Sequence, residues 1–194
     1  MSEQRRIAGD RDLRVTVDTP DADRAVVACP PHPQMGGTRS DPRLRAVGEA
    51  LGERGVACLR FDYGPWDEGE GERRDALTVL ASARDDYDEV ALFGYSFGAG
   101  VALLAAAESD PEPSALSVLA PPSSLGGADT VAALDGLSCP VQVLYGENDS
   151  TVDWEPVVLR ARERGDAVES LPGDHFFTGQ VAGIGESVAA FLTE

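Results

Sequence analysis

The sequence predicts an α/β fold in which a mainly parallel β-sheet carries helices on both faces. Short runs rich in β-branched residues alternate along the chain with longer amphipathic segments. This alternation is typical of strand–helix units around a parallel sheet. The chain has 194 residues, of which 42% are hydrophobic, enough for one domain with a buried core. We therefore expect a single domain over residues 1–194.

The predicted elements follow one another in regular order. Strands are expected at residues 14–17, 25–29, 56–61, 90–95, 115–119, 141–145 and 167–171. Helices are expected at residues 42–54, 72–83, 97–108, 155–164 and 181–192. Gly55 and Gly165 follow two of these helices, in the position where glycine commonly ends a helix. Turn-forming residues fill 30–41 and 64–71, and the segment 121–138 has room for little more than one short helix.

The charge is strongly negative. Asp and Glu number 34 against 16 basic residues, all of them Arg, which gives a formal net charge of −18. A nucleic acid or an anionic membrane surface would be repelled, and no basic stripe compensates, so neither is an expected partner. Abundant carboxylates without lysine are what a strongly hydrated surface in a salt-rich cytoplasm would show. We interpret the chain as an acidic, halophilic protein; an acidic mesophilic protein is the alternative.

Residues 90–107 form an eighteen-residue run without a charge, yet three glycines and a serine interrupt it. This pattern predicts a buried strand followed by a buried helix rather than a membrane-spanning helix. The first twelve residues are charged and lack the apolar stretch of a secretion signal, so a cytoplasmic protein is expected. The chain has three cysteines, Cys29, Cys58 and Cys139. Their odd number and their spacing favour reduced, mostly buried thiols over disulfides or a metal site. No metal or organic cofactor is expected.

A nucleophile candidate lies in Gly94-Tyr95-Ser96-Phe97-Gly98, which has the pattern G-x-S-x-G. The pentapeptide alone is weak evidence, but an apolar strand precedes it and an apolar helix follows it. A serine at such a strand-to-helix turn adopts a strained backbone conformation that projects its hydroxyl above the sheet edge. Glycines two residues to either side remove the clash that a Cβ atom would make there.

A base and an acid must follow this serine in the chain order of strand–turn–helix hydrolases. His175 is the only histidine after Ser96, and it lies just past the last predicted strand. Asp149 follows the strand 141–145 through a short turn, at the sheet edge where open α/β sheets build their sites. Asp153 and Glu147 are the alternatives for the acid.

These residues together resemble the α/β-hydrolase superfamily over most of the chain. The loop 31–38, Pro-His-Pro-Gln-Met-Gly-Gly-Thr, is similar to that of small predicted hydrolases related to dienelactone hydrolases, which carry an H-P-H-P-x-x-G-G-T loop. Pro30 replaces the first histidine of that loop, and His32 retains the second. The resemblance implies a single-domain α/β-hydrolase fold without a cap domain, because only residues 121–138 occupy the place of a cap.

The resemblance also implies an oxyanion hole built from two backbone N–H groups. By position these belong to Phe97 and Gln34, with Met35 as the alternative to Gln34. His32 is expected to brace its loop by hydrogen bonding, and Tyr95 to support the substrate or a neighbouring loop.

The function expected from these residues is a serine hydrolase that cleaves small carboxylic esters or thioesters through an acyl-enzyme intermediate on Ser96, with His175 as base and Asp149 as its partner. Without a cap the site should be shallow and open, which favours small or flexible acyl substrates. An acyltransferase or peptidase on the same fold, or a non-catalytic binding protein, are the alternatives. The elbow has no cysteine nucleophile of the kind that dienelactone hydrolases use.

The acidic composition makes a prediction about salt. Because dissolved ions screen repulsion among the carboxylates, the unfolding temperature should rise with KCl up to molar concentrations. Thermal unfolding followed by circular dichroism over a KCl series measures this dependence. A flat or falling curve would contradict the halophilic interpretation.

Overall fold

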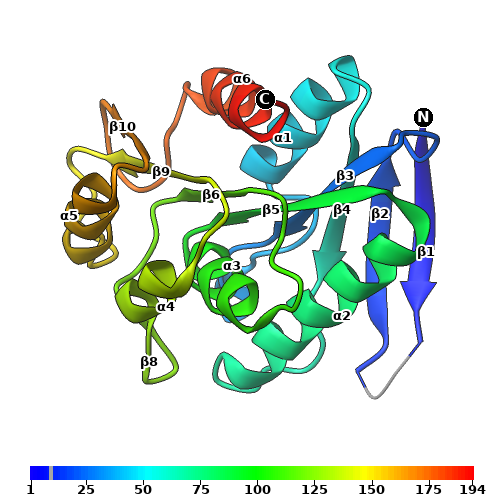
Figure 1. The fold of residues 1–194 in the computed structure, drawn as a ribbon, viewed down its shortest axis with the longest axis horizontal. Coiled ribbons are helices and arrows are strands. Elements are labelled where there is room, and N and C mark those ends of the chain that lie inside the picture. The colour runs from blue at the N-terminus through cyan, green and yellow to red at the C-terminus, as the bar shows by residue number, and fades with distance from the viewer. Residues whose placement is uncertain (9–10) are drawn as a thin grey trace.

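The computed structural model describes residues 1–8 and 11–194 (Figure 1). The strands of these residues are β1 (Ser2–Ile7), β2 (Leu13–Asp18), β3 (Arg24–Cys29), β4 (Ala57–Asp62), β5 (Glu89–Tyr95), β6 (Leu116–Leu119), β7 (Ser124–Leu125), β8 (Ala128–Asp129), β9 (Val141–Gly146) and β10 (Ala167–Leu171). The helices are the short 3₁₀ helix η1 (Pro33–Met35) and α1 (Pro42–Glu53), α2 (Glu70–Asp86), α3 (Phe97–Glu108), α4 (Thr130–Gly136), α5 (Glu155–Arg164) and α6 (Val181–Leu192).

Eight strands form one sheet in the order β1-β2-β4-β3-β5-β6-β9-β10. The pairs β1–β2 and β2–β4 are antiparallel. The strands from β4 to β10 in this order are parallel to one another. The carboxyl ends of these parallel strands therefore lie at the same edge of the sheet.

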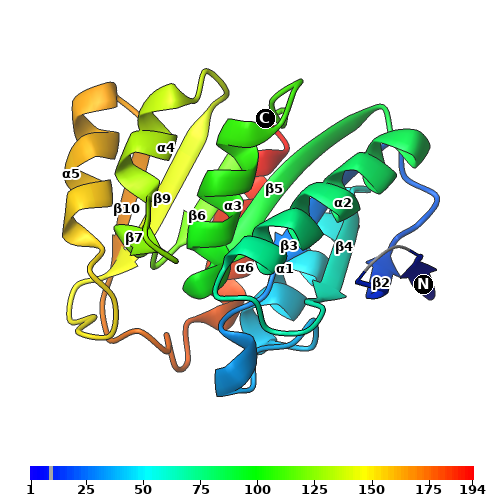
Figure 2. The same ribbon diagram turned by 90° about the horizontal axis from the view of Figure 1, so that it is seen from below.

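Helices cover both faces of the sheet. Figure 2 shows α2, α3, α4 and α5 in front of the strands and α1 and α6 behind them. Successive residues of a strand point to opposite faces, so Val27 belongs to the core beneath α2–α5 while Val26 belongs to the core beneath α1 and α6. Both residues are almost fully buried. Burial on both faces explains why the central strands are continuously apolar rather than alternating.

The predicted fold class, a mainly parallel sheet with helices on both faces and no cap domain, is confirmed. Each predicted strand and helix is present, with small differences at the ends; α2, for instance, extends over Glu70–Asp86 rather than 72–83. The segment 121–138 forms the two-stranded sheet of β7 and β8 and the seven-residue helix α4, in place of a cap. Strand β1 was not predicted, because its sequence Ser-Glu-Gln-Arg-Arg-Ile is polar and it pairs with β2 at the exposed edge of the sheet.

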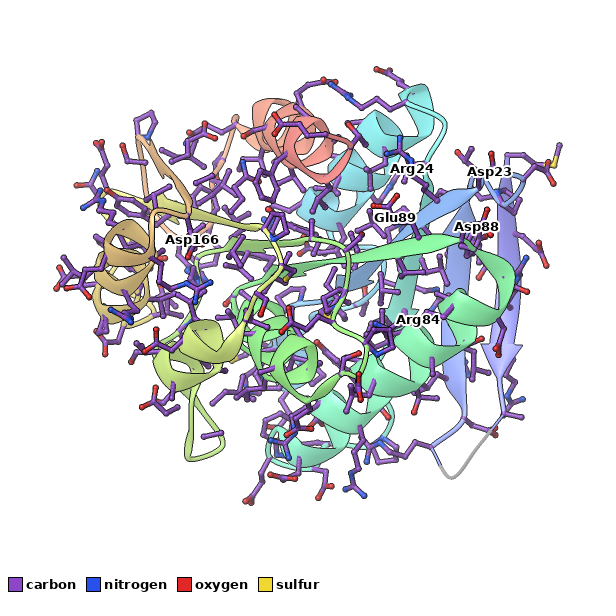
Figure 3. All side chains as sticks on the ribbon, in the orientation of Figure 1. Asp23, Arg24, Arg84, Asp88, Glu89 and Asp166 are labelled. Carbon is purple, nitrogen blue, oxygen red and sulfur yellow. The ribbon has the colours of Figure 1, made fainter. Side chains whose placement is uncertain are left out.

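Charged side chains gather where β3 and β5 begin. Figure 3 shows Asp23, Arg24, Asp88 and Glu89 close together at these amino ends. Arg24 and Glu89 are partners in the strand register, and the N–H group of Asp88 donates to the carbonyl oxygen of Asp23 over 3.0 Å. The carboxyl ends of the same strands, at the opposite edge, lead into the loops described below.

The three cysteines are free thiols. Cys29 and Cys58 are buried, and burial raises the pKa of both, to about 12 for Cys58. Cys139 is half-buried, and burial raises its pKa to about 11. Among the residues that the structure describes, no helix has both the length and the apolar character needed to cross a membrane.

Candidate active site

The predicted site residues lie in loops that leave the carboxyl ends of parallel strands. Ser96 follows β5, Asp149 follows β9 and His175 follows β10. The loop after β3 carries His32 and η1, and the loop after β4 carries Trp66. Segments far apart in the sequence are therefore brought to one edge of the sheet.

The turn between β5 and α3 holds Ser96 in a strained conformation, with φ of 57° and ψ of −121°. Its N–H group donates to the carbonyl oxygen of Leu119 over 2.8 Å, which ties the turn to the end of β6. A Cβ atom on Gly94 would lie 2.2 Å from the carbonyl oxygen of Gly98, and one on Gly98 would lie 2.2 Å from that of Cys29. Both positions therefore require glycine, as the sequence pattern predicts.

Ser96 and His175 are in direct contact. The hydroxyl oxygen Oγ of Ser96 lies 2.8 Å from Nε2 of His175. Nδ1 of the same imidazole lies 2.7 Å from Oδ2 of Asp149. A carboxylate can only accept, so the proton of the neutral imidazole sits on Nδ1 and Nε2 is left to accept from the serine hydroxyl. All three residues are buried, with 8% or less of their surface exposed.

The other acids considered from the sequence are engaged elsewhere. Asp153 accepts a hydrogen bond from Ser123 over 2.6 Å. Glu147 accepts one from Ser170. Asp149 alone of these three contacts His175, and its second oxygen Oδ1 accepts from the N–H group of Thr151 over 2.8 Å.

A hydrogen bond from Trp154 holds the backbone of the acid. The indole nitrogen of Trp154 donates to the carbonyl oxygen of Asp149 over 3.0 Å. The indole ring itself stacks on Tyr145, the ring centres 4.4 Å apart. Because Tyr145 belongs to β9, Trp154 ties the loop of Asp149 to the strand from which it departs.

Tyr95 and Arg43 hold the histidine loop. The hydroxyl of Tyr95 donates to the carbonyl oxygen of His175 over 2.9 Å. Burial raises the pKa of Tyr95 to about 12, so its phenol keeps the proton that it donates throughout the neutral range. Arg43 lies over the Tyr95 ring and donates to the carbonyl oxygen of Phe176 over 3.2 Å. Tyr95 thus supports the loop of His175 through the backbone.

Two amides remain candidates for an oxyanion hole. Phe97 is the first residue of α3 and Gln34 lies in the first turn of η1, where N–H groups have no acceptor within a helix. The N–H group of Met35 donates to the carbonyl oxygen of His32 over 3.0 Å. Since that amide is engaged, Gln34 stays the proposed second donor.

The carbonyl oxygen of His32 accepts from the N–H groups of Met35 and Gly37, while its side chain packs against aromatic rings. Its ring stacks on Trp66 with centres 4.7 Å apart, and the ring of Phe97 lies 4.8 Å away. Within residues 1–8 and 11–194, its buried Nδ1 atom has no hydrogen-bond partner. Local sequence could not predict this stacking, because Trp66 approaches His32 from a different loop.

A pocket of about 750 Å³ opens beside Ser96 and His175. One wall carries His32, Trp66 and Phe97, and another carries Leu125 of the short β7–β8 sheet. Met35 and Phe176 also line it, and their side chains are 84% and 57% exposed. The pocket is therefore largely apolar around the polar group of Ser96 and His175.

The sequence interpretation did not identify Trp66 as part of this pocket. Its loop is fixed by buried carboxylates at the start of α2: Asp75 pairs with Arg11 over 2.7 Å and accepts from the N–H group of Gly64. Glu72, fully buried, accepts from the N–H groups of Asp67 and Gly69. The position of this loop directly after a predicted strand was the signal available in the sequence.

The described part of the chain holds no group of three or more His, Cys, Asp or Glu side chains arranged to bind a metal ion.

Comparison with solved structures identifies similar proteins. An α/β serine hydrolase homologue from Coxiella burnetii superposes with a TM-score of 0.82 at 26% identity, covering 97% of this chain and 96% of that one. XC6422 from Xanthomonas campestris, described as a serine hydrolase without a lid, gives a TM-score of 0.83 at 26% identity, with 99% and 94% covered. Est1E from Butyrivibrio proteoclasticus gives 0.85 at 20% identity, with 98% and 97% covered. The chain has the fold of the lidless α/β serine hydrolases.

Sequence comparison adds a shorter match. The quorum-quenching protein AidA of Acinetobacter baumannii (strain MDR-ZJ06) is 33% identical over 90 residues, and the match covers 39% of this chain. The match spans 29% of the length of AidA. No protein-family model matches the chain.

The turn at Ser96 yields a stability prediction. Gly98→Ala should lower the free energy of unfolding by about 3 kcal/mol, because the added Cβ would collide with the backbone carbonyls of Cys29 and Pro30. Gly136→Ala is the matched control, since a Cβ at Gly136 meets nothing within 4 Å. Chemical denaturation measures both. Equal stability of the two variants would show that the elbow does not need its glycine.

Proposed function

We propose that the chain is a serine hydrolase that cleaves small carboxylic esters or thioesters through an acyl-enzyme intermediate. One observation carries the proposal: Oγ of Ser96 lies 2.8 Å from Nε2 of His175, whose Nδ1 lies 2.7 Å from Asp149. The strained turn that presents Ser96 and the pocket beside it support the same conclusion. The similarity of the whole chain to α/β serine hydrolases agrees with it.

In the proposed reaction, Oγ of Ser96 attacks the carbonyl carbon while Nε2 of His175 takes its proton. Asp149 keeps the imidazole in the required tautomer and stabilises the imidazolium that forms. The N–H groups of Phe97 and Gln34 would stabilise the negative oxygen of the tetrahedral intermediate. The protonated His175 then donates to the leaving group, and the acyl group stays on Ser96.

Water completes the cycle in the proposed mechanism. His175 removes a proton from a water molecule, which attacks the acyl carbon, and the proton returns to Ser96 as the acid product leaves.

An acyltransferase would form the same acyl-enzyme but transfer the acyl group to an alcohol or amine. Product analysis with an added acceptor alcohol distinguishes the two: hydrolysis predicts the free acid as the main product.

The nucleophile is tested by covalent labelling and substitution. A fluorophosphonate should add its mass to Ser96, and Ser96→Ala and His175→Ala should each lower kcat for 4-nitrophenyl acetate by about 10⁴-fold. Their combination should be little worse, because the two residues act as a unit. Ser40→Ala, on an exposed serine outside the pocket, is the control. All measurements belong in molar KCl, so that unfolding is not mistaken for inactivity. Near wild-type turnover by Ser96→Ala would refute the assignment.

The acid is tested by comparing two aspartates four residues apart. Asp149→Asn should lower kcat by about 10⁴-fold, since an amide cannot hold the imidazole in the tautomer that accepts from serine. Asp153→Asn should leave kcat within about twofold of the native enzyme, because Asp153 bonds to Ser123 and not to His175. Similar losses in both variants would argue against Asp149 as the partner of the base.

A further inference from the structure

The charged side chains of the pocket differ in how they are neutralised. Asp41, Arg43 and Glu68 line it together with the residues around Ser96. Arg43 pairs with Asp41, donates to the carbonyl oxygen of Phe176 and lies 4.6 Å above the centre of the Tyr95 ring. Its Nε atom is buried and has no hydrogen-bond partner among the described residues. Asp41 therefore balances the positive charge of Arg43, whose two terminal nitrogens donate to Asp41 and to the carbonyl oxygen of Phe176.

Glu68 is placed differently. Glu68 is an exposed residue of the pocket lining, and within residues 1–8 and 11–194 its carboxylate forms no ion pair. The backbone at Glu68 has a φ of 54°, which glycine adopts far more easily. Glu72 holds it there, because its two carboxylate oxygens accept from the N–H groups of Asp67 and Gly69, on either side of Glu68. The backbone of Glu68 is thus held in place, and its negative charge has no ion-pair partner among the described residues.

The neighbouring wall is aromatic. Trp66 comes from the same loop as Glu68, and its ring centre lies 4.7 Å from His32 and 5.6 Å from Phe97. The face of an aromatic ring carries a negative electrostatic potential and therefore attracts cations. A carboxylate in the lining of the same pocket also favours a cationic ligand and repels an anionic one. His32, the titratable group of this wall, stacks on Trp66 and forms no ion pair within the described residues.

From this charge balance we propose that the pocket takes esters whose acyl or alcohol part is uncharged or cationic, that it discriminates against anionic esters, and that Glu68 determines this selectivity. The inference rests on the proposed hydrolase function and names the substrate class of that site. The net charge of −18 also attracts cationic esters and repels anionic ones at long range. The charge of Glu68 adds a short-range interaction with the bound ester, and salt screens this interaction less than the long-range one.

Three phenyl acetates test the inference, with trimethylammonio, tert-butyl or carboxylate groups at the meta position. The first two have the same shape and differ in charge. Each kcat/KM is divided by the rate constant for hydroxide hydrolysis of the same ester, which removes differences in intrinsic reactivity. In the native enzyme the cationic ester should exceed the anionic one by roughly tenfold or more. A parallel set of 4-nitrophenyl esters with the charge on the acyl group covers the other orientation.

Substitutions assign the preference to one residue. Glu68→Gln should reduce the ratio of cationic to anionic ester several-fold, and Glu68→Lys should invert it. Glu53→Gln removes the same charge from an exposed position in α1 outside the pocket and should leave the ratio as it is. Thermal unfolding in the same KCl buffer confirms that each variant is folded.

The outcomes separate the two proposals. Equal reactivity of the cationic and anionic esters in the native enzyme would overturn the charge preference while leaving hydrolysis intact. A ratio that Glu68→Gln and Glu68→Lys do not change would overturn the role of Glu68. Absence of turnover with every ester, together with no fluorophosphonate on Ser96, would refute the hydrolase function and this inference with it.

Discussion

Close backbone contact at Gly98 is the constraint on which the site depends. A side chain there would collide with the carbonyl oxygens of Cys29 and Pro30, so only glycine lets the start of α3 approach the end of β3. That approach brings the turn of Ser96 beside the loop of His32 and Gln34. The N–H groups at the starts of two helices, η1 and α3, can then face the same small volume. The absence of a side chain at Gly98 therefore allows the turn of Ser96 to lie against the end of β3.

The loops around this turn are held mainly through their backbones. Tyr95 and Arg43 donate to the successive carbonyl oxygens of His175 and Phe176, and Trp154 donates to the carbonyl oxygen of Asp149. On the opposite side, the buried carboxylate of Glu72 accepts from two N–H groups of the loop after β4. A hydrogen bond to the backbone fixes the path of a loop while leaving its side chains available. This arrangement gives a chain with no cap a defined pocket.

Much of this architecture follows from local sequence patterns. Continuous apolar runs predicted the central strands because these are buried on both faces, and the order of Ser96, Asp149 and His175 after three strands predicted that they would meet. The polar strand β1 was not predicted, since it is stabilised by pairing with β2 and not by its own burial. Trp66 and Glu68 were not predicted to line the pocket, because the position of their loop depends on the long-range pair of Arg11 and Asp75. Stacking of His32 was missed for the same reason.

Both tryptophans of the chain lie in loops of the site: Trp66 stacks on His32 in the pocket wall, and Trp154 bonds to the carbonyl oxygen of Asp149. The tryptophan fluorescence of the protein therefore originates within loops of this site. The Trp66 signal therefore reports changes in its stacking on His32, and the Trp154 signal reports changes at the backbone of Asp149. Replacing either indole by phenylalanine leaves a protein with one optical reporter on one side of its own site.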